Sequence, residues 1–385
     1  MRQNKVVVSL YNTPSGRFSW WDLISVGLTK VLAKQQIDHI HFYSTYTENS
    51  VYRQKERNIA TASDLNCRQW LTQNIEPIIQ QYDKVIIHTH CYYPPTKLHI
   101  LLNKYSHVRW CCTEHRIGSS STSFFKRSIK GMLRTFNYLP KHIIAVSKAG
   151  FVRNNKLFGK NNQHLVINGI DLKRFTPQMM PTLETVKTGI YVGRIDSKKG
   201  VWMLLDAVSL LVHKVGRQDF RLKIVGGNNC EVALLKDYIK VKSIESYIEV
   251  LGYQPRPEIE VKRSHFVVIP TLIEEALSLA AIEARRIGRA VVYSEKGGLP
   301  ETMVPFKTGI KIKELTAAGI CDSLVMMLDS PLSSQGISKG LSHDLAQFSD
   351  QRMFNEYQEL LGQIFETIPF GVEVEEGERE GTASF

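Results

Sequence analysis

Short runs of apolar residues alternate with amphipathic segments along most of the chain. The runs are rich in Val and Ile and predict β-strands, and the segments between them repeat apolar residues at helical spacing. The predicted strands cover 5–10, 39–44, 84–88, 107–112, 142–146 and 164–167, then 188–193, 220–225, 248–251, 265–269 and 290–293. The predicted helices cover 19–34, 64–80, 199–215, 229–242, 275–287, 315–330 and 350–366. This alternation is typical of parallel sheets covered by helices on both faces.

The two sets of strands predict an α/β protein of two tandem doubly wound domains. A stretch with two prolines and little periodicity, 168–187, is the predicted linker. We therefore expect an N-terminal Rossmann-like domain, this linker, a C-terminal domain, a last helix and an acidic, disordered tail. The corresponding boundaries are 1–167, 168–187, 188–345, 346–368 and 369–385.

Composition agrees with two ordinary globular domains. The chain has 385 residues, of which 43% are apolar and 22% charged. It contains no run of about 20 apolar residues, so we expect no transmembrane helix. The first residues lack the apolar core of a signal peptide, and none of the six cysteines forms a C-x-x-C pair. We therefore expect a reduced, cytoplasmic protein with no disulfide framework.

Charge is distributed unevenly between the two halves. Residues 1–180 carry 25 Lys and Arg against nine Asp and Glu, a net charge of +16, whereas the remainder carries −4. A basic half beside an acidic one indicates an anionic partner, such as a phosphorylated substrate, a lipid headgroup or nucleic acid. Solubility alone is the alternative explanation.

The turn after the predicted strand 188–193 has the composition of a diphosphate site. Gly193 allows a close backbone approach, Arg194 can grip phosphate oxygens bidentately, and Lys199 stands at a helix start. A solvated basic turn is the alternative.

A second candidate follows the predicted strand 265–269. Glu275 stands in a loop that feeds a helix, and Glu283 lies about two turns further on. The backbone N–H groups of Ala276, Leu277 and Ser278 would face a ligand, since the first turn of a helix leaves its donors unpaired. The turn Lys296–Glu301 follows the next strand and closes the same rim. Surface glutamates on an amphipathic helix are the alternative.

The first domain offers fewer signals. Gly16, after the first strand, could let backbone N–H groups approach a phosphate, or it could form a plain turn. His88, His90 and His115 follow two strands, but no Cys or carboxylate cluster accompanies them, so we expect no metal site. His115 is either structural or faces the cleft between the domains. Neither G-x-G-x-x-G nor G-x-x-x-x-G-K-[ST] occurs, which argues against a Rossmann dehydrogenase and a P-loop NTPase.

Taken together, the motifs resemble the retaining glycosyltransferases of family 4, group 1, with the GT-B fold. The resemblance covers about residues 5–365 and is most specific in the second domain. The motifs are Gly193-Arg194 with Lys199-Gly200, I-V-G-G at 224–227, V-L-G at 250–252, P-T-x3-E-A-L-S-L-x3-E-A at 270–284, G-G-L-P-E at 297–301, Ala145-Val146-Ser147 and N-G-I-D with Phe175 at 168–175. The family often has E-G-F-G where this chain has E-A-L-S at 275–278.

The resemblance implies a role for each matching residue. Arg194 and Lys199 would neutralise the donor diphosphate, and Glu275 would bind sugar hydroxyls together with the backbone of residues 276–279 (Ala276, Leu277, Ser278 and Leu279). Glu283 would hold the ribose of the nucleotide. His115 would lie near the reacting sugar, and Gly16 near the phosphates and the acceptor. Gly193 would contribute to the donor site, and the last helix, 350–366, would cross back to pack on the first domain.

The same resemblance implies a metal-independent hexosyl- or N-acetylhexosaminyl-transferase without a cofactor. The donor would be a UDP- or GDP-sugar, and the acceptor a glycan or lipid-linked glycan of lipopolysaccharide, capsule or exopolysaccharide. Residues 124–136 place apolar side chains on one helical side and basic ones around it, which favours an anionic membrane surface or, alternatively, core packing.

Three competing hypotheses remain at this point. A nucleotide-sugar epimerase and a non-catalytic scaffold can share the two-domain fold. Nucleic-acid binding would fit the basic half, but no stacking or recognition motif supports it, and we expect none.

Overall fold

The computed structural model describes residues 4–15, 19–46, 58–61, 63–91, 97–115, 117, 139–181, 185–335 and 345–369. Three features predicted from the sequence lie outside these residues: the Gly16 loop position, the basic segment 124–136 and the tail from 370 onward. Within the described part, no helix is both long and apolar enough to cross a bilayer.

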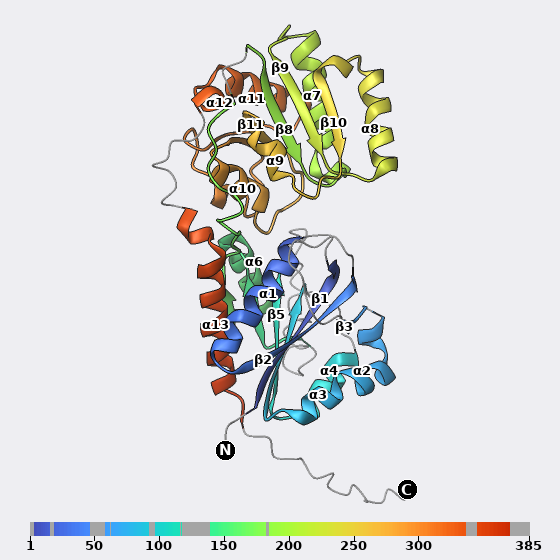
Figure 1. The fold of residues 1–385 in the computed structure, drawn as a ribbon, viewed down its shortest axis with the longest axis vertical. Helices are drawn as coiled ribbons and strands as arrows, with labels where there is room; N and C mark the ends of the chain where they lie inside the picture. The colour runs from blue at the N-terminus through green and yellow to red at the C-terminus, as the bar shows by residue number, and fades with distance from the viewer. Residues whose placement is uncertain are drawn as a thin grey trace, which may run out of the picture.

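The first domain is built on a seven-stranded parallel sheet of order β3-β2-β1-β4-β5-β6-β7 (Figure 1). Its central strand β4 is buried along its whole length, which explains its largely apolar sequence. The strands are β1 (Lys5–Ser15), β2 (Ile37–Tyr46), β3 (Asn58–Ile59), β4 (Lys84–His90), β5 (Val108–Glu114), β6 (His142–Ala145) and β7 (Gln163–Leu165).

Helices cover both faces of this first sheet. One face packs against α1 (Ser19–Lys34) and α13 (Asp350–Glu366). The other packs against α2 (Arg68–Asn74), α3 (Glu76–Gln81) and α4 (Lys97–Leu102), with the 3-10 turn η1 (Asp64–Asn66) before them. Helix α6 (Lys148–Phe158) follows β6.

The second domain repeats the plan with a six-stranded parallel sheet of order β10-β9-β8-β11-β12-β13. Its strands are β8 (Lys187–Val192), β9 (Phe220–Val225), β10 (Ile248–Gly252), β11 (Phe266–Ile269), β12 (Ala290–Tyr293) and β13 (Gly309–Lys311). Helices α7 (Val201–His213), α8 (Asn229–Val241) and α11 (Ala317–Asp329) pack on one face, and α9 (Glu258–Lys262) and α10 (Leu279–Ile287) on the other. The predicted fold class, two tandem doubly wound parallel sheets, is confirmed.

Two segments join the domains. Ile170 forms a parallel bridge with Ser349, directly before α13, and Figure 1 shows α13 (red) running along the first domain beside α1. On the other side, the buried guanidinium of Arg289 donates to the backbone carbonyls of Gln178 and Met179 at 3.0 and 2.8 Å. This fastens residues 178 and 179 to the second domain.

Two predicted helices differ from the structure for local reasons. The predicted helix 64–80 is broken into η1, α2 and α3, and Pro77 stands in the first turn of α3, where its missing N–H costs nothing. The predicted helix 275–287 begins only at Leu279, with Ser278 as its N-cap residue. The short elements β3, β13, α12 (Leu332–Gln335), η3 (Glu245–Tyr247) and η4 (Pro300–Thr302) were not predicted.

Candidate functional site

The turn after β8 is held in place by its own backbone and by the loop after β11. Tyr191 donates its hydroxyl hydrogen bond to the Arg194 carbonyl at 2.6 Å, and Asp196 accepts from the Lys198 N–H at 2.8 Å to cap the 3-10 turn η2 (Ser197–Lys199). Gly200 has a φ of +77°, and a Cβ there would lie 2.0 Å from the Pro270 carbonyl oxygen. Only glycine fits this position, so the turn and the loop 270–278 sit backbone to backbone.

The two predicted diphosphate ligands have different surroundings. The Lys199 ammonium lies 2.5 Å from the Glu275 carboxylate, and both side chains are largely buried, at 22% and 16% exposure. Arg194 is 61% exposed and lies 3.5 Å from Asp196 on its own turn. Without ligand, each cation therefore faces a carboxylate. The partly buried Lys199–Glu275 pair is the tighter one, because less water screens it.

The loop that carries Glu275 is fixed by the turn after β12. Gly298 donates its N–H to the Glu275 carbonyl at 2.7 Å, and Gly297 donates to the Glu274 carboxylate at 2.6 Å. Gly297 has a φ of +58°, and a Cβ there would lie 2.1 Å from the Glu275 oxygen. The backbone at Glu275 thus packs so closely against Gly297 that no residue with a Cβ fits at position 297.

Because α10 begins at Leu279, the unpaired first-turn donors differ from those expected. They belong to Ser278, Leu279, Ala280 and Ala281, since the first helical bond runs from the Ile282 N–H to the Ser278 carbonyl. The prediction that Ala276 and Leu277 lie at the helix start is wrong. Leu277 is instead buried in the core beneath α10.

Glu283 lies in a different environment from Glu275. Burial raises the pKa of Glu283 to about 7, an effect that Arg174 opposes and Glu258 reinforces. It lines a small cavity between the domains with Trp20 and Leu23 of α1 and with Ile170, Asp171, Arg174 and Phe175 of the linker. Trp20 and Arg174 are not among the residues predicted from the sequence, where the Trp-Trp pair at the start of α1 is the signal that points to this cavity.

In the first domain, His115 joins a cluster of rings. Its Nε2 lies 3.2 Å from His90 Nδ1, and the indoles of Trp20 and Trp21 meet it edge-on at 5.3 and 4.7 Å between ring centroids. Burial lowers the pKa of His90 well below its usual value. His115 is therefore held by a neutral imidazole and two indoles at the edge where α1 faces the linker.

His88 and His90 are buried side chains of β4. His88 Nε2 lies 2.8 Å from Thr113 Oγ1, and burial lowers the His88 pKa to about 3. Within the residues that the structure describes, no three His, Cys, Asp or Glu side chains gather as metal ligands.

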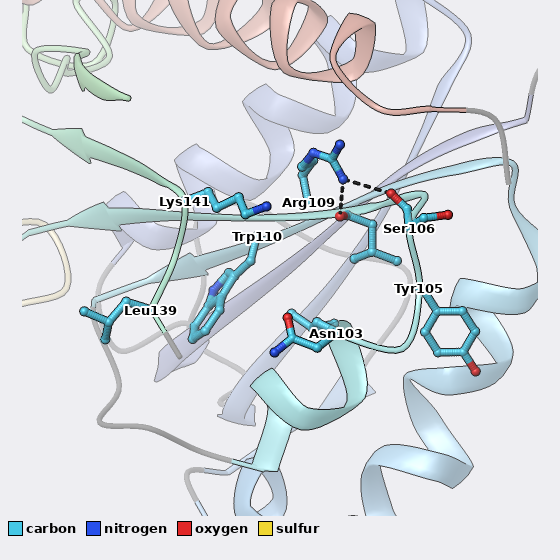
Figure 2. Close-up of a pocket in the computed structure, with 9 residues that line it drawn as sticks. Asn103, Tyr105, Ser106, Arg109, Trp110, Leu139 and Lys141 are labelled. Carbon is cyan, nitrogen blue, oxygen red and sulfur yellow. Dashed lines mark hydrogen bonds between the residues drawn. The ribbon is translucent and has the colours of Figure 1, made fainter. Parts of the chain in front are cut away.

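A larger pocket, of about 180 Å³, opens elsewhere in the first domain. Figure 2 shows it at the start of β5, with Trp110, Lys141 and Asn103 around it. The Arg109 guanidinium at its edge donates to the carbonyls of Ser106 and Val108 at 2.9 Å. None of the predicted site residues lines this pocket, so the candidate site is defined by the loops after β8, β11 and β12.

The second domain, which carries these loops, matches a known protein family. Residues 186–330 match the family model described as glycosyl transferases group 1. A D-inositol 3-phosphate glycosyltransferase of Corynebacterium diphtheriae is 26% identical over 200 residues, which is 48% of this chain and 47% of that protein. A lipopolysaccharide 1,2-N-acetylglucosaminetransferase of Salmonella typhimurium is 26% identical over 198 residues, 49% of each chain.

Two solved structures match nearly the whole chain. A glycosyltransferase of Rickettsia africae has a TM-score of 0.71 at 17% identity, covering 94% of this chain and 99% of that one. Anabaena HepE in complex with UDP and glucose has a TM-score of 0.69 at 14% identity, covering 94% and 100%. The fold is therefore GT-B, and residues 186–330 carry the match to the group 1 glycosyl transferases, the family that the motifs resemble. The chain spans about half the length of the curated relatives it matches.

Proposed function

We propose that this protein transfers a sugar from a nucleoside-diphosphate donor to a glycan or lipid-linked acceptor. The observation that carries the proposal is the Lys199–Glu275 pair, 2.5 Å apart. Its two loops pack backbone to backbone at Gly200, and Gly297 packs the turn after β12 against the Glu275 loop. A fixed cation beside a fixed carboxylate suits a ligand with a diphosphate next to sugar hydroxyls. HepE, which shares the fold, has been solved with UDP-glucose, and this supports a uridine or similar donor.

In the proposed reaction, the bond between the anomeric carbon and the diphosphate oxygen breaks, and the electron pair leaves with the diphosphate. The acceptor hydroxyl attacks from the same face, with retention, and its proton passes to a departing phosphate oxygen. The reacting sugar acquires oxocarbenium character. Lys199 and Arg194 stabilise the negative charge on the leaving group and take the place of a metal ion. No cofactor is required.

The other predicted residues complete the proposed site. Glu275 accepts hydrogen bonds from sugar hydroxyls, while Gly193 and the backbone N–H groups of Ser278 and Leu279 face the donor. Glu283 accepts from the ribose hydroxyls, and its raised pKa makes this contact sensitive to pH near neutrality. His115 hydrogen-bonds the reacting sugar from the first domain.

Thermal denaturation with UDP, GDP, ADP and CMP, each with and without EDTA, tests this function. A ligand that binds only the folded state raises stability by RT ln(1 + [L]/Kd). We expect one nucleoside diphosphate to raise the melting temperature equally with and without EDTA. No shift with any nucleotide would contradict the proposal and favour a scaffold. Conversion of a free nucleotide sugar without an acceptor would instead identify an epimerase.

We further propose that the acceptor belongs to a bacterial surface polysaccharide and that the basic first domain meets it at an anionic inner membrane surface. The net +16 of residues 1–180 supports this, and so does the likeness to a lipopolysaccharide transferase. Co-sedimentation with anionic and with neutral vesicles at low salt tests it. Equal recovery of the protein in both supernatants would contradict membrane binding.

A further inference from the structure

The first turn of α6 is neutralised by a residue of the other domain. Glu301, in η4, accepts from the backbone N–H groups of Lys148 and Ala149 at 2.9 and 2.6 Å through its two carboxylate oxygens. The N-cap Ser147 accepts from the Gly150 N–H at 3.0 Å. Helix α6 has no acidic residue in its own first turn. Glu301 therefore supplies both the missing acceptors and the missing negative charge.

The segment that carries Glu301 is fixed to the second domain. Leu299, two residues before Glu301, is fully buried in the core beneath α10. Gly298 donates to the Glu275 carbonyl at 2.7 Å, and a Cβ on Gly298 would lie 2.2 Å from the Ala276 oxygen and 3.0 Å from Ser147 Oγ. The segment is thus pressed between α6 of one domain and the Glu275 loop of the other.

These contacts form one continuous chain across the cleft. It runs from the first turn of α6 to Glu301, through the backbone of Gly298 to Glu275, and through the Glu275 carboxylate to Lys199. Residues 298–301 are joined by the backbone and by the bond from the Glu301 N–H to the Gly298 carbonyl at 3.2 Å, and the other contacts are hydrogen bonds or an ion pair of 2.9 Å or less. A movement of the first domain at α6 must therefore either break the Glu301 contact or move the loop that holds Glu275.

We propose that Glu301 is a positioning residue that sets Glu275 according to the placement of the first domain. This inference rests on the proposed function, because it assigns Glu275 to the sugar part of the donor. When Glu301 accepts hydrogen bonds from α6, the turn 296–301 holds the Glu275 loop in place, and the Glu275 carboxylate binds the sugar hydroxyls. When the contact is broken, the nucleotide still binds to the second domain, but the sugar loses its partner.

The test compares Glu301→Gln with wild type in two measurements on the full chain. The first is the affinity for UDP and for UDP-glucose, or for GDP and GDP-mannose if guanosine is the base found. The second is the radius of gyration from solution X-ray scattering. In Glu301→Gln, the side-chain amide keeps one oxygen acceptor but has no negative charge. Its NH2 group faces a backbone N–H of α6, so that a donor meets a donor. The loss of a hydrogen bond to a charged group changes an equilibrium constant by a factor of roughly ten or more.

We expect Glu301→Gln to bind the free nucleotide within about twofold of wild type, to bind the sugar nucleotide about tenfold more weakly, and to have a larger radius of gyration. Glu301→Asp, which keeps the charge on a shorter side chain, should fall between the two. The matched control is Glu295→Gln, because Glu295 is 60% exposed and pairs with Lys311 at the surface. It should behave like wild type.

Three outcomes would overturn the proposal. One is an unchanged radius of gyration together with an unchanged ratio of the two affinities. Another is an equal loss of both affinities with a lower melting temperature, which would mean that Glu301 merely stabilises the loop. The third is a Glu295→Gln variant that shows the same changes. If wild type binds no nucleotide, the proposed function fails, and the scattering data still test the contact between the domains.

Discussion

The carboxyl edges of the two sheets carry different chemistry. In the first domain, the rings of Tyr11 and His90 stack 4.3 Å apart inside the fold, and burial keeps the imidazole neutral by lowering its pKa. In the second, the Lys199 ammonium and the Glu275 carboxylate form an ion pair at 2.5 Å. The same type of parallel sheet thus carries buried aromatic rings at its carboxyl edge in the first domain and an ion pair at that edge in the second. The difference suits a ligand that is a neutral sugar at one end and a diphosphate at the other.

The largest effect expected from this comparison is acid unfolding of the first domain. The folded-state pKa of His88 is about 3 against an unfolded value of 6.5, so the neutral form is favoured in the fold. The stability it contributes is complete above pH 6.5 and is lost as the pH falls toward 3. The loss is about 2 kcal/mol at pH 5 and about 5 kcal/mol over the whole window. His90 acts in the same direction.

Tryptophan fluorescence can follow this transition, because Trp20, Trp21, Trp70 and Trp110 lie in the first domain and Trp202 in the second. In Trp202→Phe, the signal reports the first domain alone. His88→Gln should lower the midpoint pH of this transition, whereas His213→Gln, on the surface of the second domain, should not. An unchanged midpoint in His88→Gln would show that His88 does not control the acid limit.

The second domain should have the opposite pH dependence through Glu283. Its folded-state pKa, about 7, is above the ordinary glutamate value of 4.5, so the native state binds the proton more tightly. Stability is therefore greatest below pH 4.5 and is lost as the pH rises through 7, by up to about 3 kcal/mol. Glu283→Gln should be more stable than wild type at pH 8 and nearly equal to it at pH 4.5.

Urea unfolding at pH 5, 6.5 and 8 measures this difference. Glu359→Gln, at an exposed position of α13, is the control and should leave the wild-type pH dependence intact. If Glu283→Gln gains no stability at alkaline pH, the carboxylate is better solvated than its surroundings indicate.

A third prediction concerns the Lys199–Glu275 ion pair itself. Lys199→Ala should lower turnover of the donor by on the order of 10²-fold or more, the loss seen when one preorganised charge-stabilising group is removed. Lys198→Ala removes the neighbouring exposed lysine and should have little effect. Steady-state rates with the donor identified by the nucleotide screen check both. Near-wild-type turnover in Lys199→Ala would show that Lys199 does not stabilise the charge on the leaving diphosphate.

The sequence was most informative where local pattern decides the structure. Strands β9 and β12 match the predicted limits, because buried parallel strands have continuous apolar sequences between turns. The two-residue β3 and three-residue β13 are too short to show such a pattern. The four-residue delay of α10 also has a tertiary cause, since residues 270–278 are held by Gly200 and Gly297 rather than by helical hydrogen bonds.

The candidate site was predictable to the same extent. The motifs predicted Lys199 and Glu275 from separate loops, and the structure brings these two side chains together. The motifs did not predict the contact of Glu301 with α6, because its partners are backbone N–H groups that any residue could supply. The neutral state of His90 depends on the rings of Tyr11 and Trp21 packed around it, which are distant in sequence.

The smallest effect expected separates a local helix cap from the cap that crosses the domains. Helix α8 has its own capping box: Asn228 accepts from the Glu231 N–H at 3.0 Å, and Glu231 accepts from the Asn228 N–H at 2.8 Å. Asn228→Ala should cost about 1 kcal/mol of stability, confined to the second domain, whereas Asn229→Ala beside it should cost less. The fluorescence of Trp202→Phe reports the first domain alone. In this background, Asn228→Ala should leave the urea midpoint of the first domain unchanged. A shift of that midpoint would mean that the two domains unfold as one unit, and the contrast with Glu301 would then rest on the scattering and affinity data.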